Sequence, residues 1–488
     1  MYTASIFLFR RDLRLFDNSG LRLALQRSST VWPIFCFDPQ QVEDHPYRSL
    51  PALRFMLESL ADLQLQLVEA GGRLLLLRGQ PQELLPELLQ QSRAQAVFVN
   101  RDFTPFSQQR DTQLQKVVKQ QGAAWHSVDD LLLHPPENTR KADGNPYTVF
   151  TPFYRNAARL TVPLPEPLPK SQWGTSVLPL ESDRGQDLMS FQMEARHSET
   201  PTGGRSAALA ILAKASRFTD YGEKRDFPAI AQGTTRLSAH HKFGTVSVRE
   251  VFHHLLPTLG SSDHPLLRQL YWRDFFTQIA FHFPKVFGNA FQSSYNDLPW
   301  STNEQRFAVW CEGQTGFPIV DAGMRELNNT GYMHNRARMI VASFLTKDLH
   351  IDWRWGERYF AQRLVDYDPC VNNGSWQWAA STGCDAQPYF RIFNPWLQQK
   401  RFDVQCEYIH RWIPELRGVS PTRLHRWDKE ADTLGIQGYP LRWWSIVRSA
   451  SRPRNFSRNM PGDSVAWSDN SNHYSNRLFC CRDRHQCR

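Results

Sequence analysis

The sequence contains no hydrophobic run long enough to cross a membrane. Its longest apolar stretches, 5–9 and 74–77, are far shorter than the roughly 20 residues that a spanning helix needs. The amino terminus also lacks the apolar core of a secretory signal, because Arg10 and Arg11 follow the first short run directly. We therefore expect an intracellular protein, cytoplasmic or associated with the nucleus or nucleoid, with no membrane partner.

Cysteine is too scarce and too scattered for a disulfide framework. The 488 residues include eight cysteines, five of which stand alone between residues 36 and 406. This spacing is typical of a protein in a reducing compartment. The cysteines and histidine within 480–487 match no standard pair of CxxC units, so no metal site is predicted.

Excess positive charge is concentrated at the C-terminal end. The chain has a net charge of +9, and residues 442–488 contain nine Arg, no Lys and three Asp. That stretch therefore carries +6 and leaves +3 for residues 1–441. Binding of a polyanion by the body of the protein must depend on a local basic patch. Residues 442–488 also lack apolar periodicity and are predicted to form a disordered basic tail.

Residues 1–130 alternate short apolar runs with amphipathic stretches. The runs 5–9, 31–37, 73–77, 96–100 and 123–128 predict strands, and 53–70, 81–91 and 107–121 predict helices. This alternation indicates an α/β domain with a parallel sheet covered on both faces. No GxGxxG follows any strand, so the dinucleotide fingerprint is missing. The crevice at the carboxyl ends of the strands is the expected site for a planar or phosphorylated ligand.

The pattern changes after residue 130. Residues 131–200 are rich in proline and predict an irregular interdomain linker, and residues 201–441 predict an almost wholly helical domain. Helices are expected at 204–215, 247–255, 265–281, 301–312, 319–330, 334–345 and 352–364.

Aromatic residues and three polar clusters stand out in the helical domain. Most of the 16 Trp lie after residue 270, which suits a bound planar ligand, stacked bases or a Trp-rich core. The segment 366–383 combines acids, amides, Trp and Gly, which favours neither helix nor strand, so we expect an irregular segment lining a site. The turn 234–238 is rich in hydroxyl groups able to hold phosphate. In 333–339, Asn335, Arg338 and Met339 fall on one helical face.

At these clusters, and at the motif FLFRRDLRLFDN of 7–18, the sequence resembles the photolyase and cryptochrome flavoproteins. It is most similar to the class I cyclobutane pyrimidine dimer photolyases, over roughly residues 5–440, including YFRIFNP at 389–395. The resemblance implies an α/β N-terminal domain and an all-α, FAD-binding C-terminal domain. It also implies a light-driven carbon–carbon lyase that acts as a monomer on DNA containing pyrimidine dimers.

The same resemblance assigns residues to the flavin. The positions matching flavin contacts are Tyr221, Thr234, Thr235, Arg236, Leu237, Ser238, Arg273, Asn335, Arg338, Asp366, Tyr367, Asp368 and Asn372. Asp366 and Arg338 would form a charge-assisted pair beside the cofactor. Asn372 would lie near the redox-active ring nitrogen, where a neutral amide can exchange hydrogen-bond partners.

Other positions match the family's electron donors and its DNA contacts. Trp376, Trp353 and Trp300 correspond to a chain of electron donors between the flavin and the surface. Trp272, Trp378 and Met339 correspond to residues that face the flipped lesion. Arg225, Gln269, Arg336 and Gln398 correspond to contacts with the lesion or the DNA backbone.

Departures from the family pattern leave alternatives open. Gln269 replaces the carboxylate beside the dimer and is what (6-4) photolyases carry, yet the histidine pair of those enzymes is absent from 333–339. A (6-4) photolyase and a cryptochrome-like photoreceptor using the tail for signalling are the alternative functions. Thr104 stands where folate-binding members have an acid, so a second chromophore, of folate or deazaflavin type, is expected without a fixed identity.

Overall fold

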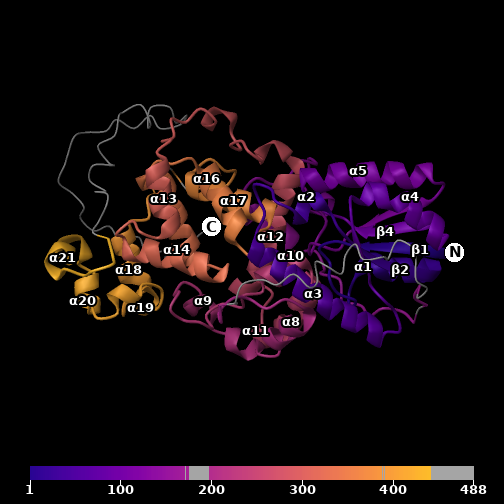
Figure 1. Ribbon diagram of the computed structural model, residues 1–488, viewed down its shortest axis with the longest axis horizontal. Helices are drawn as coiled ribbons and strands as arrows, with labels where there is room; N and C mark the ends of the chain where they lie inside the picture. The colour runs from indigo at the N-terminus through magenta and orange to yellow at the C-terminus, as the bar shows by residue number, and fades with distance from the viewer. Residues whose placement is uncertain (171, 175–196, 387, 389–390, 441–488) are drawn as a thin grey trace, which may run out of the picture.

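The computed structural model describes residues 1–170, 172–174, 197–386, 388 and 391–440. An N-terminal part with a central sheet, indigo to purple in Figure 1, adjoins a larger helical part. The predicted tail at 442–488 lies outside the described residues, so its expected disorder stays a prediction. No helix in the described ranges is both long and apolar enough to cross a membrane.

The sheet has five parallel strands in the order β3-β2-β1-β4-β5. Their bounds are β1 Tyr2–Phe9, β2 Ser28–Phe37, β3 Leu75–Arg78, β4 Ala96–Asn100 and β5 Ala124–Val128. All five β4 residues are buried, as expected for a strand covered on both faces. β1 pairs with β2 on one side and β4 on the other, so the strand order reverses there. A crevice is therefore expected at the carboxyl ends of β1 and β4.

Helices cover both faces of this sheet, as predicted. The bounds are α1 Ser19–Arg27, α2 Pro39–Val42, α3 Leu50–Glu69, α4 Pro81–Ser92 and α5 Pro105–Gln120. α1 and α3 pack on the face that carries Phe7 and Phe9. α4 and α5 cover the opposite face. The sequence analysis missed α1, which begins after Asn18, whose side chain accepts a hydrogen bond from the Leu21 amide.

The linker predicted to be irregular contains ordered structure. Residues Phe150–Ala157 form α6, which packs against a long helix of the helical part, α12 (Pro265–His282). A 3₁₀ turn occupies Pro136–Thr139, and Trp173 forms a bridge to Val31 at the sheet. The prediction of a wholly irregular linker was therefore wrong. Burial of Phe150, Phe153 and Ala157 accounts for the short helix.

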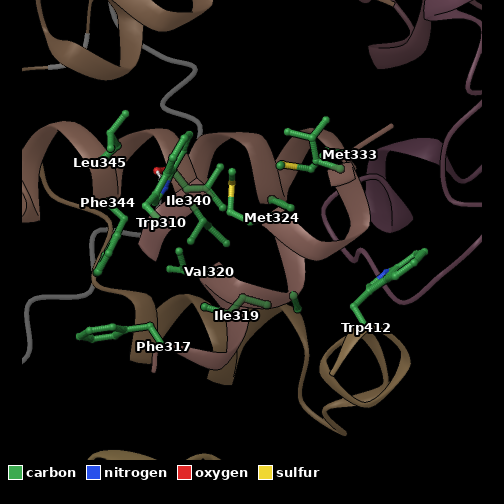
Figure 2. Close-up of a cluster of buried hydrophobic side chains, with 14 of the residues drawn as sticks. Trp310, Phe317, Ile319, Val320, Met324, Met333, Ile340, Phe344, Leu345 and Trp412 are labelled. Atoms are coloured by element: carbon green, nitrogen blue, oxygen red, sulfur yellow. Dashed lines mark hydrogen bonds between the residues drawn. The ribbon is translucent and has the colours of Figure 1, made fainter. Parts of the chain in front are cut away.

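The helical part contains each of the seven predicted helices, with shifted ends. The bounds are α8 Arg205–Leu212, α9 Tyr221–Lys224, α10 Ser238–Phe243, α11 Val248–Leu259, α12, α13 Glu304–Glu312, α14 Pro318–Thr330, α15 Asn335–Ser343, α16 Trp353–Arg363, α17 Pro369–Ala380, α18 Pro395–Phe402, α19 Glu407–Trp412, α20 Pro421–Leu424 and α21 Trp427–Leu434. A π-helical turn, Phe344–Asp348, follows α15. Figure 2 shows part of the apolar core, where Trp310, Met324 and Ile340 meet between α13, α14 and α15.

The segment 366–383 was wrongly predicted to be irregular, since most of it forms α17. The Asp368 side chain accepts hydrogen bonds from the amides of Cys370 and Val371, and Pro369 occupies the first helical position. Such a cap with proline at the start favours a helix despite weak internal propensity. Gly374 lies where a Cβ atom would approach the Phe276 ring to 2.1 Å, so glycine permits close packing against α12.

Buried ion pairs connect the sheet part to the helical part. Arg249 of α11 lies 3.0 Å from Asp17 and 2.8 Å from Asp130, and Arg14 lies 2.6 Å from Asp130. Burial would raise the pKa of Asp130, but the two guanidinium groups hold it well below its ordinary value. The charged carboxylate is thus stable inside the protein, and the two parts share one polar interface.

Candidate functional site

Helix α17 lies at the centre of the predicted site. It packs against α12, α15 and α16, which carry eight of the other predicted residues. Trp272 and Arg273 come from α12, Asn335, Arg338 and Met339 from α15, and Trp353 from α16. The structure therefore brings clusters more than 100 residues apart in the sequence into one region.

Arg338 and Asp366 form the predicted pair. The Arg338 Nη2 donates to Asp366 Oδ2 at 2.9 Å, and Arg338 Nε donates to the Met333 carbonyl at 2.8 Å. Burial alone would lower the pKa of Arg338, but the charge of Asp366 raises it above its ordinary value. The second carboxylate oxygen, Asp366 Oδ1, is buried without a hydrogen-bond partner among the described residues. A donor group on a bound ligand can satisfy this oxygen.

Asp368 is held by the N-terminal part of the chain. One oxygen caps α17, and the other accepts from Arg11, which follows β1 and also lies 3.6 Å from Asp102. Burial would raise the pKa of Asp368, but Arg11, Lys242 and Arg273 hold it well below its ordinary value. Arg11 was not predicted to belong to the site. Its partner lies 357 residues away, which no local pattern signals.

Asn372 is oriented by a glutamate that the sequence analysis missed. Asn372 Nδ2 donates to Glu357 Oε1 at 3.1 Å and to the Glu357 backbone carbonyl at 3.3 Å. Tyr367 donates its hydroxyl to the same Oε1 at 3.3 Å. Burial raises the pKa of Glu357 above its ordinary value. The Asn372 amide nitrogen is thus engaged, which leaves the amide oxygen to accept from another group.

The hydroxyl-rich turn 234–238 precedes α10. Thr235 Oγ1 accepts from the Leu237 amide at 3.3 Å, and Arg236 has a positive φ of 56°. The Arg236 guanidinium lies 3.3 Å from Glu199 and above the Tyr332 ring at 4.7 Å. Because this side chain already has an acidic partner, backbone amides and hydroxyls are the groups left for a phosphate. Leu237 is buried, Thr234 is half-buried and Ser238 is exposed.

Two further predicted residues lie close to this turn. Tyr221 of α9 is buried, and burial raises the pKa of its hydroxyl to about 12. Arg273 donates to the carbonyls of Leu131 at 2.6 Å and His241 at 3.2 Å. Arg273 therefore joins α12 to α10 and to the segment that leaves β5.

The three predicted electron donors run from the core toward the surface. Trp376 and Trp353 are 2% and 1% exposed, whereas Trp300 is only partly buried. Gly356 allows α16 and α17 to approach closely, because a Cβ there would lie 2.2 Å from the Trp376 ring. The Ser301 amide donates to the His350 carbonyl at 2.7 Å, which holds Trp300 beside the segment that precedes Trp353.

The predicted DNA-facing arginines share one acid. Arg336 lies 2.8 Å from Asp226, and Arg225 lies 3.9 Å from the same carboxylate. The Arg336 guanidinium also lies over the Phe402 ring at 4.2 Å. Asp226 was not predicted. It stands among basic residues in the sequence, and that position does not reveal which side chains lie near it in the fold.

The remaining predicted contacts are only partly buried. Gln269 donates its amide to the Pro265 carbonyl, one turn earlier on α12, at 3.0 Å. Trp378 lies 6.3 Å from Phe393 in an edge arrangement, and Gln398 lies on α18. Trp272 stacks on Phe150 of α6, which the sequence analysis did not single out.

The histidine at the start of α15 is buried and has a structural role. His334 caps the helix, since its Nδ1 accepts from the Arg336 amide at 3.1 Å, and burial lowers its pKa to about 4. Asn335 and Met339 lie together, with Asn335 Nδ2 3.7 Å from the Met339 sulfur. His334 is therefore a neutral structural residue near pH 7.

The comparisons with known proteins agree with this geometry. A family model described as "DNA photolyase" matches residues 5–170, and one described as "FAD binding domain of DNA photolyase" matches residues 266–454. A deoxyribodipyrimidine photo-lyase of Synechococcus is 40% identical over 475 residues, covering 92% of this chain and 95% of the relative. The chain belongs to the DNA photolyase family.

Solved structures of this family share the fold. An archaeal photolyase from Sulfolobus tokodaii with two FAD molecules has a TM-score of 0.84 and 39% identity, covering 94% of this chain and all of that one. A cryptochrome from Synechocystis has a TM-score of 0.85 and 29% identity, covering 93% and 98%. The FAD-binding family match extends to residue 454, so the expectation that resemblance ends near residue 440 was wrong.

The residues of this photolyase-family site fit a flavin. Asp366 Oδ1 lacks a partner among the described residues, and Asn372 uses its amide nitrogen to donate to Glu357, which leaves its oxygen as an acceptor. N–H groups of a ring system can donate to both oxygens. The hydroxyls and backbone amides of the turn 234–238 suit the pyrophosphate of FAD.

A cleft lies at the predicted crevice, between the N-terminal part and the helical part. Its lining includes Arg10, Arg11, Arg14, Arg101 and Arg273. These residues follow β1 and β4 or come from α12. Thr104, the departure from folate-binding members, caps α5 by accepting from the Ser107 amide at 3.1 Å. The four arginines that follow β1 and β4 each already pair with a carboxylate, and Asp12 and Asp130 also line the cleft, so its charge is mixed.

Proposed function

We propose that this member of the photolyase family uses light to split cyclobutane pyrimidine dimers in DNA. The observation that carries this proposal is the face of α15 on which Met339 lies, because His334 is buried as a helix cap instead. Splitting of a cyclobutane dimer needs an electron and no general acid. The (6-4) chemistry needs a proton donor, which this face lacks.

The cofactor and the chain divide the work. FAD, when bound and excited by light, supplies the electron that the flipped dimer accepts and later returns. Asp366 and Asn372 hold its polar edge, and the turn 234–238 holds its phosphates. Trp376, Trp353 and Trp300 restore electrons to the site from the surface. Tyr221, Leu237, Tyr367 and their neighbours exclude water from it.

DNA binding follows from the partly exposed residues around the site. Arg225 and Arg336 contact phosphates, Gln398 and Gln269 contact the lesion or its backbone, and Trp272 and Trp378 stack on the flipped bases. The structural similarity to the Synechocystis cryptochrome supports the alternative function, a cryptochrome-like photoreceptor. Repair is favoured because a signalling protein has no need of this complete lesion-facing set.

The test is a blue-light assay with two duplexes, one carrying a cyclobutane dimer and one a (6-4) photoproduct. The purified, flavin-loaded chain should restore the first under light, leave it unchanged in the dark and leave the second unchanged under both conditions. Gln269→Glu should raise the yield on the cyclobutane dimer and give no (6-4) repair. Light-dependent repair of the (6-4) duplex, or of neither duplex, contradicts the proposal.

A second chromophore, of folate or deazaflavin type, is part of this proposal. The support comes from a relative, since the photolyase from Sulfolobus tokodaii holds two FAD molecules. Mass spectrometry of the small molecules released on denaturation identifies the chromophore. We further propose that the chain works inside the cell as a monomer, which light scattering of the purified protein tests.

A further inference from the structure

Trp272 has a covered face. The six-membered ring of Phe150 lies parallel to the indole of Trp272, with an angle of 6° between the planes and 3.5 Å between the ring centroids. Phe150 is 8% exposed, whereas Trp272 is partly exposed. Phe150 therefore covers one face of the Trp272 indole. A ligand can contact only the part of the indole that Phe150 leaves uncovered.

Phe150 is itself fixed from two directions. Its backbone amide donates to Asp385 Oδ2 at 2.9 Å, which ties the first residue of α6 to the segment after α17. The Phe150 ring also stacks on the ring of Tyr154, one turn later on α6, with 5.8 Å between the ring centroids and 20° between the planes. Tyr154 donates its hydroxyl at 2.6 Å to Asp263, which also pairs with Arg268 of α12 at 2.6 Å. Phe150 thus has little freedom to leave the indole.

We propose that Phe150 is a positioning residue for lesion recognition, acting through Trp272. The inference rests on the proposed function, in which Trp272 stacks on a flipped pyrimidine. Parallel contact with Phe150 holds the indole in one plane before DNA arrives, so binding of the lesion does not have to order it. Preorganisation of this kind increases affinity for the lesion and leaves contacts with the phosphate backbone unchanged.

The first experiment compares three variants in the dark. Dissociation constants are measured for a duplex with one cyclobutane dimer and for the undamaged duplex, using protein with full flavin absorbance. Phe150→Leu should weaken binding to the dimer roughly three- to tenfold, the range expected for losing one aromatic pair. Binding to undamaged DNA should stay the same, and Phe150→Tyr should restore lesion binding.

Phe153→Leu is the matched control. Phe153 lies on the same helix, is fully buried and packs against Phe275. Its replacement perturbs α6 without removing the ring that covers Trp272. The ratio of lesion to undamaged affinity should therefore be unchanged in Phe153→Leu. If the ratio falls equally in Phe150→Leu and Phe153→Leu, the proposal is overturned, because the effect then comes from the packing of α6.

A double-mutant cycle tests whether the effect passes through the indole. In a Trp272→Leu background, Phe150→Leu should change lesion affinity by less than about twofold, since the two effects are coupled. Full additivity overturns the proposal. An undiminished lesion preference in Phe150→Leu overturns this inference alone. Absence of any lesion preference in the unmodified chain overturns the proposed function as well.

Discussion

Asp366 is a buried carboxylate whose cationic partner among the described residues is Arg338. Asp366→Ala leaves that guanidinium without its counter-ion, which should lower the free energy of unfolding by about 2–4 kcal/mol. Flavin content per chain should fall with it. Urea unfolding and the flavin absorbance of the purified protein measure both.

An exposed pair provides the control for this substitution. Glu43 and Arg78 lie 2.7 Å apart with side chains 51% and 47% exposed. Glu43→Ala should cost less than about 1 kcal/mol and leave the flavin in place. Full flavin occupancy in Asp366→Ala would remove Asp366 from the site.

Asp226 neutralises part of the predicted DNA-binding surface. Asp226→Asn releases Arg336 and Arg225, so affinity for undamaged DNA should rise severalfold at low salt. The slope of log K against log salt should steepen by about 0.9 for each additional phosphate that the freed arginines neutralise. Asp220→Asn makes the same charge change beside Lys224 and is the control. Equal effects in the two variants would show that only net charge matters.

Site residues that belong to a sequence motif were predictable. Residues whose role depends on a partner that is distant in the sequence were not. Arg338 and Asp366 are 28 residues apart, and the resemblance to a known family was needed to pair them. Arg11, Glu357, Asp226 and Phe150 were missed because each acts on a residue from another element. Their partners depend on how helices pack, which a linear pattern does not contain.

Helix α16 carries the middle electron donor and a matched control two residues away. Trp353→Phe should stop most photoreduction of oxidised flavin in the presence of a reductant, because phenylalanine is much harder to oxidise than tryptophan. Trp355, which packs against Phe307, lies outside the predicted chain, and Trp355→Phe should photoreduce at the normal rate. The rate of photoreduction is measured in both variants from the change in flavin absorbance under blue light. Similar rates in Trp353→Phe and the unmodified chain would contradict the assignment.

Helix α12 buries an acid at its centre. Asp274 accepts from the His134 amide at 3.2 Å, and burial raises its pKa from 3.8 to about 7. The folded state therefore holds a proton that the unfolded state loses above pH 3.8, so this group's contribution to stability falls as pH rises through about 7. Asp274→Asn should flatten that decline and stabilise the protein at pH 8 by about 2–4 kcal/mol. Unfolding by urea at pH 5 and pH 8 measures the difference.

At the level of elements, strands and long helices were predictable and α17 was not. Apolar runs and helical periodicity located the five strands and seven helices. The composition of 366–383 argued against a helix, but Asp368, Pro369 and packing against three neighbouring helices outweighed it. When a helix carries polar residues required by a site, its sequence loses the pattern from which a helix is predicted.

The basic C-terminal stretch belongs to the scale of the whole molecule. Residues 455–488, beyond the family match, contain five Arg and three Asp, so they add +2 of the +6 in 442–488. Deletion of 455–488 should leave dimer repair intact and change the salt slope of DNA binding little. Deletion from 442 should weaken non-specific DNA binding several-fold. Equal affinity for all three lengths would show that these arginines do not meet DNA.

The ion pairs between the two parts of the chain also set the order of events during synthesis. Asp17 meets Arg249 across 232 residues, and Arg11 meets Asp368 across 357. At about 5–20 residues per second, Arg11 waits roughly 20–70 s on the ribosome for its partner. During that interval the newly made sheet carries charges that its finished form buries. The polar interface between the two parts can therefore form fully only after α17 has been synthesised.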